Sequence, residues 1–334
     1  MFDYQLNFNL NKFQQEASDK IVKLFLEKKN IIIDAICGAG KTEMLLETIK
    51  VGLNNNLKIG FACPRRQLLL ELYERISKYF NYSKIGLVMG GYQKNNNSNF
   101  IFLTCHQLKK YYRYFDLLII DEIDAYPFYN NNELENDAFL SAKQFIFLSA
   151  TVPNKYYELV KTKQLAIVTN FYRHHLKKVP EPKVIECHKY LFLIELLKII
   201  KQTQNNPLII YVASIKQGKK LEFSLKLFRC QVKFIHAKNV SQQIINNFKQ
   251  GKYNILISTT VLERGITLKK VNVVVYDSGH LVFNETTLSQ ICGRVGRDIT
   301  YFSGDIFFLS DKITIDIIEC QKRLEKCNEM FNLS

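Results

Sequence analysis

Short apolar runs alternate with amphipathic stretches along the whole chain. In the first half, runs rich in Ile, Leu, Phe and Val predict strands at Ile31–Ile36, Lys58–Cys63, Ile85–Met89, Phe100–Thr104, Leu117–Asp121, Phe145–Ser149 and Ala166–Thr169. Strands that are buried on both faces of a parallel sheet have this composition. Between two of them, Leu68, Leu72, Ile76 and Phe80 recur every four residues, which predicts the buried face of a helix.

The second half repeats this alternation. Apolar runs predict strands at Leu208–Val212, Val232–Ile235, Ile255–Ser258, Val273–Tyr276 and Ile306–Leu309. Helical spacing predicts helices over 190–203, 215–229, 240–251, 286–297 and 312–331. Between the halves, Val179-Pro180-Glu181-Pro182 resists regular structure. The pattern therefore predicts two successive α/β domains with parallel sheets, over residues 1–180 and 181–334.

The composition is that of a globular protein. Of the 334 residues, 47% are hydrophobic and 23% are charged, which excludes disordered and collagen-like classes. No apolar stretch reaches the roughly 18 residues of a membrane span, and no signal-peptide pattern is present. The eight cysteines form no C-x-x-C pair, so we expect no zinc and a reduced, cytoplasmic protein.

The chain is strongly basic, with a formal net charge of +15. Such a charge is the electrostatic footprint of a nucleic-acid-binding protein. Only ten of the 46 basic residues are Arg, however, and Asn, Ile and Lys are abundant. That bias is also typical of an A+T-rich genome, so charge alone leaves both explanations open.

The sharpest motif is a phosphate loop, Ala35-Ile36-Cys37-Gly38-Ala39-Gly40-Lys41-Thr42, between a predicted strand and a predicted helix. Gly38 and Gly40 let backbone N–H groups turn toward phosphate oxygens, and the following helix directs its positive end there. Lys41 would reach the outer phosphates, and the Thr42 hydroxyl would hold Mg²⁺. The motif predicts ATP binding.

An acidic segment, Asp121-Glu122-Ile123-Asp124, ends another predicted strand. By itself it is also compatible with a solvated strand end. Paired with the phosphate loop, it predicts that Asp121 holds Mg²⁺ and that Glu122 orients and polarises the attacking water.

A third set of residues lies near the end of the chain, in Gln290-Ile291-Cys292-Gly293-Arg294-Val295-Gly296-Arg297. Arg294 and Arg297 are three residues apart and would share one face of the predicted helix. Two guanidinium groups aimed across an interdomain cleft would stabilise the γ-phosphate of ATP. A solvated basic helix face is the plainer alternative.

Together with Ser149-Ala150-Thr151, these segments resemble the motifs of superfamily 2 helicases of the DExD/H-box class, in the same order and over nearly the whole chain. The resemblance implies two tandem RecA-like domains that bind ATP and Mg²⁺ in the cleft between them. It implies that Gln14 reads the adenine base and that Gly265 contacts the nucleotide. It also assigns Gln290 to the catalytic set, and Ser149 and Thr151 to coupling.

The same resemblance implies a nucleic-acid track that runs across both domains. Its members would contact the phosphates of a single strand; they are Pro64, Arg65, Thr104, His106, Ser214, Thr259 and Thr260. Ser214 and Thr104 each precede a predicted helix, and a helix N-cap is the structural alternative for both.

Finer similarity points to the competence protein ComFA family. It rests on Gly38–Met44, Asp121–Pro127, Leu262–Thr267, Phe171–Pro180 and His280–Phe283. This resemblance implies an ATP-driven motor that moves single-stranded DNA into the cytoplasm during natural transformation. The implied partners are the DNA-uptake channel and other competence proteins, with peripheral attachment at the inner face of the membrane. No small-molecule substrate beyond ATP is implied, and the zinc module common in the family is not expected here.

Other functions share much of this motif set. A replication-restart or repair DNA helicase and an RNA-remodelling helicase remain alternatives, and a catalytically idle binding module is a third. Intact Lys41, Glu122 and Arg297 argue against the idle module. With no separating wedge visible, we predict translocation rather than efficient duplex unwinding.

Overall fold

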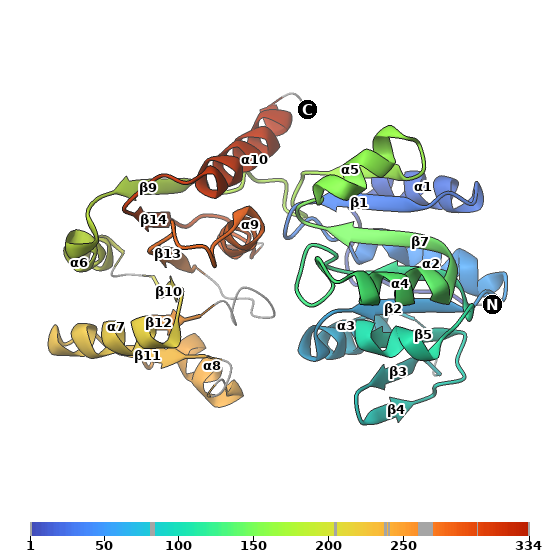
Figure 1. Cartoon of the computed structure of the whole chain (residues 1–334), viewed down its shortest axis with the longest axis horizontal. Helices are drawn as coiled ribbons and strands as arrows, with labels where there is room; N and C mark the ends of the chain where they lie inside the picture. Colours follow the sequence, from blue (N-terminus) through green and yellow to red (C-terminus); the bar gives the residue numbers. More distant parts are fainter. Residues whose placement is uncertain are drawn as a thin grey trace. The chain divides into compact units, whose positions relative to one another are not determined.

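The computed structural model of the chain describes residues 2–80, 84–203, 206–236, 239, 241–259, 270–298 and 300–332. It divides into two compact units, Met1–His174 and His175–Ser334 (Figure 1). These are called unit 1 and unit 2 below. The functional domain boundary after residue 180 stays a prediction.

Unit 1 is built on an eight-stranded sheet in the order β4-β3-β5-β2-β6-β7-β1-β8 (Figure 1). The strands are β1 (Ile31–Ala35), β2 (Ile59–Cys63), β3 (Gly86–Met89), β4 (Tyr92–Lys94), β5 (Phe100–Thr104), β6 (Phe115–Ile120), β7 (Ala142–Ser149) and β8 (Ala166–Asn170). All neighbours are parallel except β3 and β4. Every residue of β1, β2 and β5 is buried, as continuous apolar strands of a covered parallel sheet require.

Helical segments connect these strands. They are α1 (Lys12–Leu26), the short 3₁₀ helix η1 (Glu43–Leu45), α2 (Leu46–Asn54), α3 (Arg66–Tyr79), the 3₁₀ helix η2 (Cys105–Lys110), α4 (Asn132–Ser141) and α5 (Asn154–Lys161). The apolar spacing that predicts a helix near residue 70 is confirmed, since Leu72 and Ile76 form the buried face of α3. One apolar cluster includes Phe115 and Leu118 of β6 and Phe147 of β7.

Unit 2 has a six-stranded, all-parallel sheet in the order β11-β12-β10-β13-β14-β9. Its strands are β9 (Pro182–Glu186), β10 (Leu208–Val212), β11 (Val232–Ile235), β12 (Ile255–Ser258), β13 (Asn272–Tyr276) and β14 (Ile306–Ser310). Its helices are η3 (Lys189–Leu191), α6 (Phe192–Gln202), α7 (Ile215–Leu227), α8 (Gln242–Lys249), α9 (Glu285–Cys292) and α10 (Ile315–Asn332). The predicted pair of α/β domains with parallel sheets is confirmed.

Two strands of the structure, β4 and β9, are not predicted by the apolar pattern of the sequence. β4 is a short, fully exposed strand, so it carries no apolar signal. β9 begins at Pro182, inside the segment predicted to be irregular, and that part of the prediction is wrong. β9 is an edge strand that pairs only with β14 among the described strands, with Pro182 opposite Ile306. The first residue of an edge strand is a position where a proline costs no ladder hydrogen bond.

Candidate active site

The phosphate loop spans residues 36–42, between β1 and η1. Gly38 and Gly40 have φ angles of 87° and 78°, a left-handed conformation that side chains other than glycine rarely adopt. The ammonium group of Lys41 donates a 2.8 Å hydrogen bond to the carbonyl oxygen of Ala35. The loop therefore combines the turn geometry and the cation that a polyphosphate needs.

The first turn of α1 supports this loop. Gln14 Nε2 donates a 2.9 Å hydrogen bond to the carbonyl of Ala39, and Gln14 Oε1 accepts one of 2.9 Å from the backbone N–H of Asn11. Asn11 Oδ1 in turn accepts from the N–H of Gln14, which completes a capping box. A Cβ atom added at Gly40 would lie 2.4 Å from Gln14 Nε2. Gln14 thus connects a helix start to the loop and leaves no space for a side chain at position 40.

The segment that follows β8 also holds the loop. The backbone N–H of Ile36 donates to the carbonyl of Asn170 at 3.3 Å, and the N–H of His174 donates to the carbonyl of Gly38 at 3.2 Å. The Nδ1 atom of His174 lies 3.2 Å from that same oxygen. Asn11 Nδ2 donates to the carbonyl of His174 at 3.2 Å. The motifs do not predict these hydrogen bonds, because contacts between main-chain atoms require no particular residue type.

The acidic segment begins where β6 ends. Asp121 is 8% exposed, and its backbone N–H donates to the carbonyl of Ala62 at 2.9 Å. Its Oδ1 accepts a 2.9 Å hydrogen bond from the N–H of Glu122. Glu122 has a φ of 56°, which turns the chain sharply away from the strand. The Thr42 hydroxyl and the Asp121 carboxylate are oxygen donors of the kind that Mg²⁺ prefers, so these residues fit that ion.

Asp124 is buried and connects this segment to the end of β7. The Thr151 hydroxyl donates a 3.0 Å hydrogen bond to Asp124 Oδ2. The Ser149 hydroxyl donates to the carbonyl of Thr151 at 2.6 Å and accepts from its N–H at 3.2 Å. Burial raises the pKa of Asp124, while the charge of Lys41 and the hydrogen bond from Thr151 oppose that rise. The coupling role of Ser149 and Thr151 stays a prediction, and the structure places the buried Asp124 in contact with Thr151.

Strand order brings the three segments of unit 1 together. β6, β7 and β1 are adjacent and parallel, so their carboxyl ends lie at one edge of the sheet. The acidic segment follows β6, Ser149–Thr151 follows β7, and the phosphate loop follows β1. In open α/β sheets this edge is where ligands bind.

The end of α9 differs from the prediction over 286–297. α9 ends at Cys292, and the chain then forms turns up to Gly296, whose φ of 64° stops any continuation. Arg294 and Arg297 therefore do not share a helix face, and that inference is wrong. Glycines at a helix end are common because the left-handed conformation costs them little.

These turns keep both arginines near the last turn of α9. Gln290 is buried within that helix, and Arg294 and Arg297 are half-buried. The carbonyl oxygen of Gly296 lies 2.8 Å from His175 Nε2, which fixes the turn to the start of unit 2. The arginines thus come from a supported turn rather than from a helix face.

Known protein families and known relatives are similar to this sequence over most of its length. Residues 7–154 match the family described as type III restriction enzyme, res subunit, and residues 188–298 match the family described as helicase conserved C-terminal domain. Competence protein ComFA of Bacillus subtilis (strain 168) is 31% identical over 335 residues, which cover 96% of this chain and 72% of the relative. Competence protein ComFA of Streptococcus pneumoniae (strain ATCC BAA-255 / R6) is 32% identical over 339 residues, covering 97% and 78%. The chain belongs to the competence protein ComFA family.

A solved structure supports the fold of this ComFA-family chain. Dbp5 of S. cerevisiae, bound to RNA and ADP BeF3, superposes with a TM-score of 0.67 at 20% identity, covering 97% of this chain and 93% of Dbp5. At that identity the likeness shows the fold alone, a pair of RecA-like helicase domains. The family matches confirm the prediction of a nucleic-acid-dependent ATPase of the helicase class. Use of ATP and Mg²⁺ follows from membership of that class.

The predicted track residues of unit 1 lie where two strands end. Pro64 is buried after β2, and the half-buried Arg65 precedes α3 without a side-chain capping bond. Thr104 is buried before η2 and likewise makes no capping bond, which removes the N-cap alternative for it. His106 is exposed on η2. Their contact with nucleic acid stays a prediction.

In unit 2 the capping alternative holds for Ser214. Its hydroxyl accepts a 3.1 Å hydrogen bond from the N–H of Gln217 at the start of α7. Thr259 is half-buried after β12. Thr260 and Gly265 lie outside the described residues.

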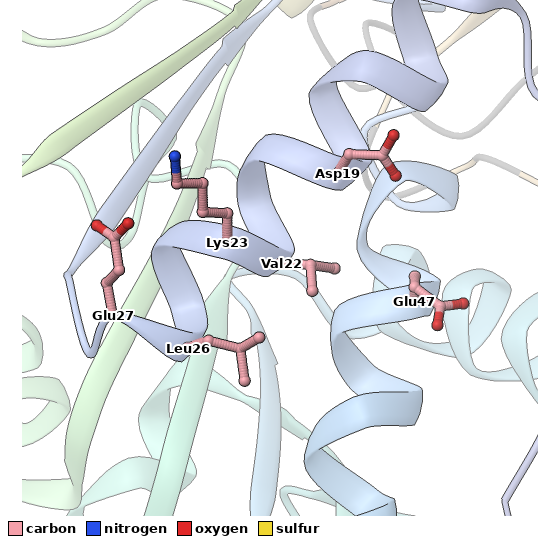
Figure 2. A pocket seen from close by; sticks show the side chains of 6 residues that line it. All are labelled: Asp19, Val22, Lys23, Leu26, Glu27 and Glu47. Carbon is pink, nitrogen blue, oxygen red and sulfur yellow. The ribbon is translucent and has the colours of Figure 1, made fainter.

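A shallow hollow of about 540 Å³ lies on α1 and α2, apart from the phosphate loop. Figure 2 shows its lining, in which Lys23 and the apolar Val22 and Leu26 stand among three carboxylates, those of Asp19, Glu27 and Glu47. Three carboxylates among six lining residues disfavour a phosphate ligand in this hollow.

Other chemical features of the described residues are few. None of the eight cysteines forms a disulfide, and burial raises the pKa of the Cys63 and Cys105 thiols well above the ordinary value. Within the described ranges, no group of three or more metal-ligating side chains gathers. No helix of that part of the chain is long and apolar enough to cross a membrane.

Proposed function

We propose that this ComFA-family protein is an ATP-driven translocase on single-stranded DNA that acts in DNA uptake during transformation. The observation that carries the proposal is the arrangement in unit 1. The phosphate loop, the acidic segment and the Ser149–Thr151 segment follow three adjacent parallel strands, and the Asp124–Thr151 hydrogen bond connects two of them. A nucleotide site joined to a second element is what a motor requires.

Within this site we assign roles to the side chains of unit 1. The backbone of the loop from Gly38 to Gly40 would cradle the phosphates, and Lys41 would leave the Ala35 carbonyl for the outer phosphates. Thr42 and Asp121 would hold Mg²⁺, which when bound offsets the negative charge that develops on the phosphates. Glu122 would orient the attacking water and accept its proton.

For unit 2 the assignments rest on family resemblance. Gln290, Arg294 and Arg297 would contribute to hydrolysis, with the arginines adding positive charge at the γ-phosphate. Ser214 and Thr259 would contact phosphates of the strand. Ser214 can do so while it caps α7, because a hydroxyl oxygen that accepts one hydrogen bond still has a proton to donate.

The test is steady-state ATP hydrolysis with Mg²⁺, without nucleic acid and with single-stranded DNA, duplex DNA or RNA. We expect strong stimulation by single-stranded DNA that is lost in Lys41→Ala. Full stimulated hydrolysis by that variant would show that the site is assigned wrongly. Lys143→Ala is a suitable control, because this exposed cation lies at the start of β7, at the other end of that strand from Ser149, and pairs with Asp116.

Other outcomes of the same assay select other functions. Preferential stimulation by RNA would favour an RNA-remodelling helicase. Equal stimulation by single-stranded and duplex DNA, with efficient opening of long duplexes, would favour a replication-restart or repair helicase. No hydrolysis with any strand would favour an idle binding module.

Partners and location belong to the same proposal. We infer that the protein works with the DNA-uptake channel and other competence proteins, in the cytoplasm and peripherally at the inner face of the membrane. Fractionation of cells that carry the tagged chain, with and without the channel, tests this. Recovery of the chain in the membrane fraction only when the channel is present would support this inference. Equal recovery there with and without the channel would contradict it.

A further inference from the structure

A guanidinium group touches the Mg²⁺ end of the phosphate loop. Arg75 lies on α3, and its Nη2 donates a 3.2 Å hydrogen bond to the hydroxyl oxygen of Thr42. Its Nε lies 3.6 Å from Oε1 of Glu43. The Glu43 side chain is only 11% exposed, whereas that of Arg75 is 42% exposed. One cation from a different helix thus contacts the last residue of the loop and the first residue of η1.

The Glu43 carboxylate places a negative charge beside the phosphate loop. Its Oε2 lies 3.5 Å from the position that a Cβ of Gly40 would occupy, so a largely buried carboxylate stands beside the turn that would cradle phosphates. A carboxylate there repels a polyphosphate, and burial strengthens that repulsion because little water screens it. Arg75 supplies the opposite charge at short range.

The charges of Glu43 and Arg75 both act on the pKa of a nearby side chain, Tyr79. Burial raises the pKa of Tyr79, the charge of Glu43 raises it further, and the charge of Arg75 lowers it. The two ions therefore act on the same small region between α3 and the loop.

We propose that Arg75 is a positioning residue that holds the Thr42 hydroxyl and neutralises Glu43, so that the loop accepts a nucleoside triphosphate with its divalent cation. The inference rests on the proposed function, since it assumes that ATP binds this loop. A hydroxyl oxygen has two acceptor lone pairs, so Thr42 can accept from Arg75 and still face a metal.

The helix that carries Arg75 gives this contact a second consequence. α3 follows the predicted track residues Pro64 and Arg65 directly. The same helix therefore begins beside the predicted strand track and carries the residue that contacts the predicted metal end of the nucleotide site.

The experiment measures nucleotide binding rather than turnover alone. Calorimetric titration with ADP at a series of Mg²⁺ concentrations is compared for the wild type, Arg75→Ala, Arg75→Lys and the double variant Glu43→Gln/Arg75→Ala. Lys78→Ala, an exposed cation on the same helix, is the matched control. We expect affinity for ADP with Mg²⁺ to fall about tenfold in Arg75→Ala, mainly because the largely buried Glu43 carboxylate is left uncompensated beside the phosphates.

The ADP affinity of the other variants distinguishes an effect of charge from a purely structural role of Arg75. Glu43→Gln/Arg75→Ala should regain most of the lost affinity because no carboxylate is left uncompensated, Arg75→Lys should regain part, and Lys78→Ala should match the wild type. In hydrolysis assays we expect Arg75→Ala to raise KM for ATP more than it lowers kcat. Equal weakening in the single and double variants would mean a structural role and would overturn the inference.

The outcomes also separate this inference from the proposed function. Wild-type binding with unchanged binding by Arg75→Ala overturns the role of Arg75 alone. No binding by the wild type, with and without Mg²⁺, overturns both. If Arg75→Ala fails to fold because Glu43 is left buried and unpaired, the double variant decides, and a tenfold loss of affinity in it would be evidence against the inference.

Discussion

Thr151 donates a 3.0 Å hydrogen bond from its hydroxyl to Oδ2 of Asp124, across 27 residues of sequence. Both residues are buried, and they follow two neighbouring strands, β7 and β6. Because Asp124 also lies within the field of Lys41, the bond connects the phosphate loop to the segment after β7. We therefore expect a substitution at any one of Lys41, Asp124 and Thr151 to alter the environment of the other two.

Thr151→Val tests that connection. The substitution keeps the shape of the side chain but leaves the buried Asp124 without this donor, so we expect a loss of about 1–3 kcal/mol in the free energy of unfolding. We also expect strand-stimulated hydrolysis to fall more than basal hydrolysis. Urea unfolding and the ATPase assay measure the two effects. Thr151→Ser keeps the hydroxyl, and a loss as large as that of Thr151→Val would contradict the argument.

Asp124→Asn tests the pH dependence of stability. Burial raises the pKa of Asp124 in the folded chain, so the folded state binds a proton more tightly than the unfolded state does. Stability contributed by that proton is present below the ordinary carboxyl pKa of about 3.9 and is lost as pH rises through the raised value. We therefore expect the wild type to lose stability relative to Asp124→Asn across this window. Urea unfolding of both proteins at several pH values gives the difference, and parallel curves would contradict the prediction.

Much of the fold follows from local sequence patterns. The buried strands of both sheets are continuous apolar runs, and burial on both faces imposes that composition directly. β4 and β9 do not follow from the pattern because β4 buries none of its residues and β9 buries only Pro182, so neither needs an apolar run. The predicted helix extends too far because the helical spacing continues past Gly293, whereas α9 ends at Cys292 and only turns follow up to Gly296.

The candidate site divides in the same way. Lys41 and Asp121 each lie in a short motif of consecutive residues, so the sequence alone is enough to propose them, and their roles stay predictions. Contacts made across the fold are not recognisable in this way. The support of the loop by His174 and the bond from Arg75 to Thr42 join residues more than 30 positions apart, and a single sequence carries no signal for such pairs.

Gly40→Ala tests the geometry of the loop. At Gly40, a φ of 78° strains any side chain, and the added Cβ would also meet Gln14 Nε2 at 2.4 Å. We expect loss of nucleotide binding together with a stability loss of about 1–3 kcal/mol. Gly91→Ala is the matched control, since Gly91 has a φ of 73° but no heavy atom within 4 Å of the added Cβ. It should share the backbone strain and bind nucleotide normally. Nucleotide binding lost equally in both variants would show that the crowding at Gln14 is unimportant.

Arg297→Ala tests whether the turn after α9 takes part in hydrolysis. The residue is half-buried and lies next to Gly296, whose carbonyl is held by His175, so the substitution removes a charge from a supported turn rather than from a helix. If Arg297 acts on the γ-phosphate, kcat should fall by about 10³-fold, the lower end for an arginine finger. Binding of ADP, which lacks that phosphate, should change little. Arg323→Ala on α10 is a matched control for loss of an arginine from unit 2. A large loss of ADP affinity in Arg297→Ala with unchanged kcat would instead assign Arg297 to nucleotide binding.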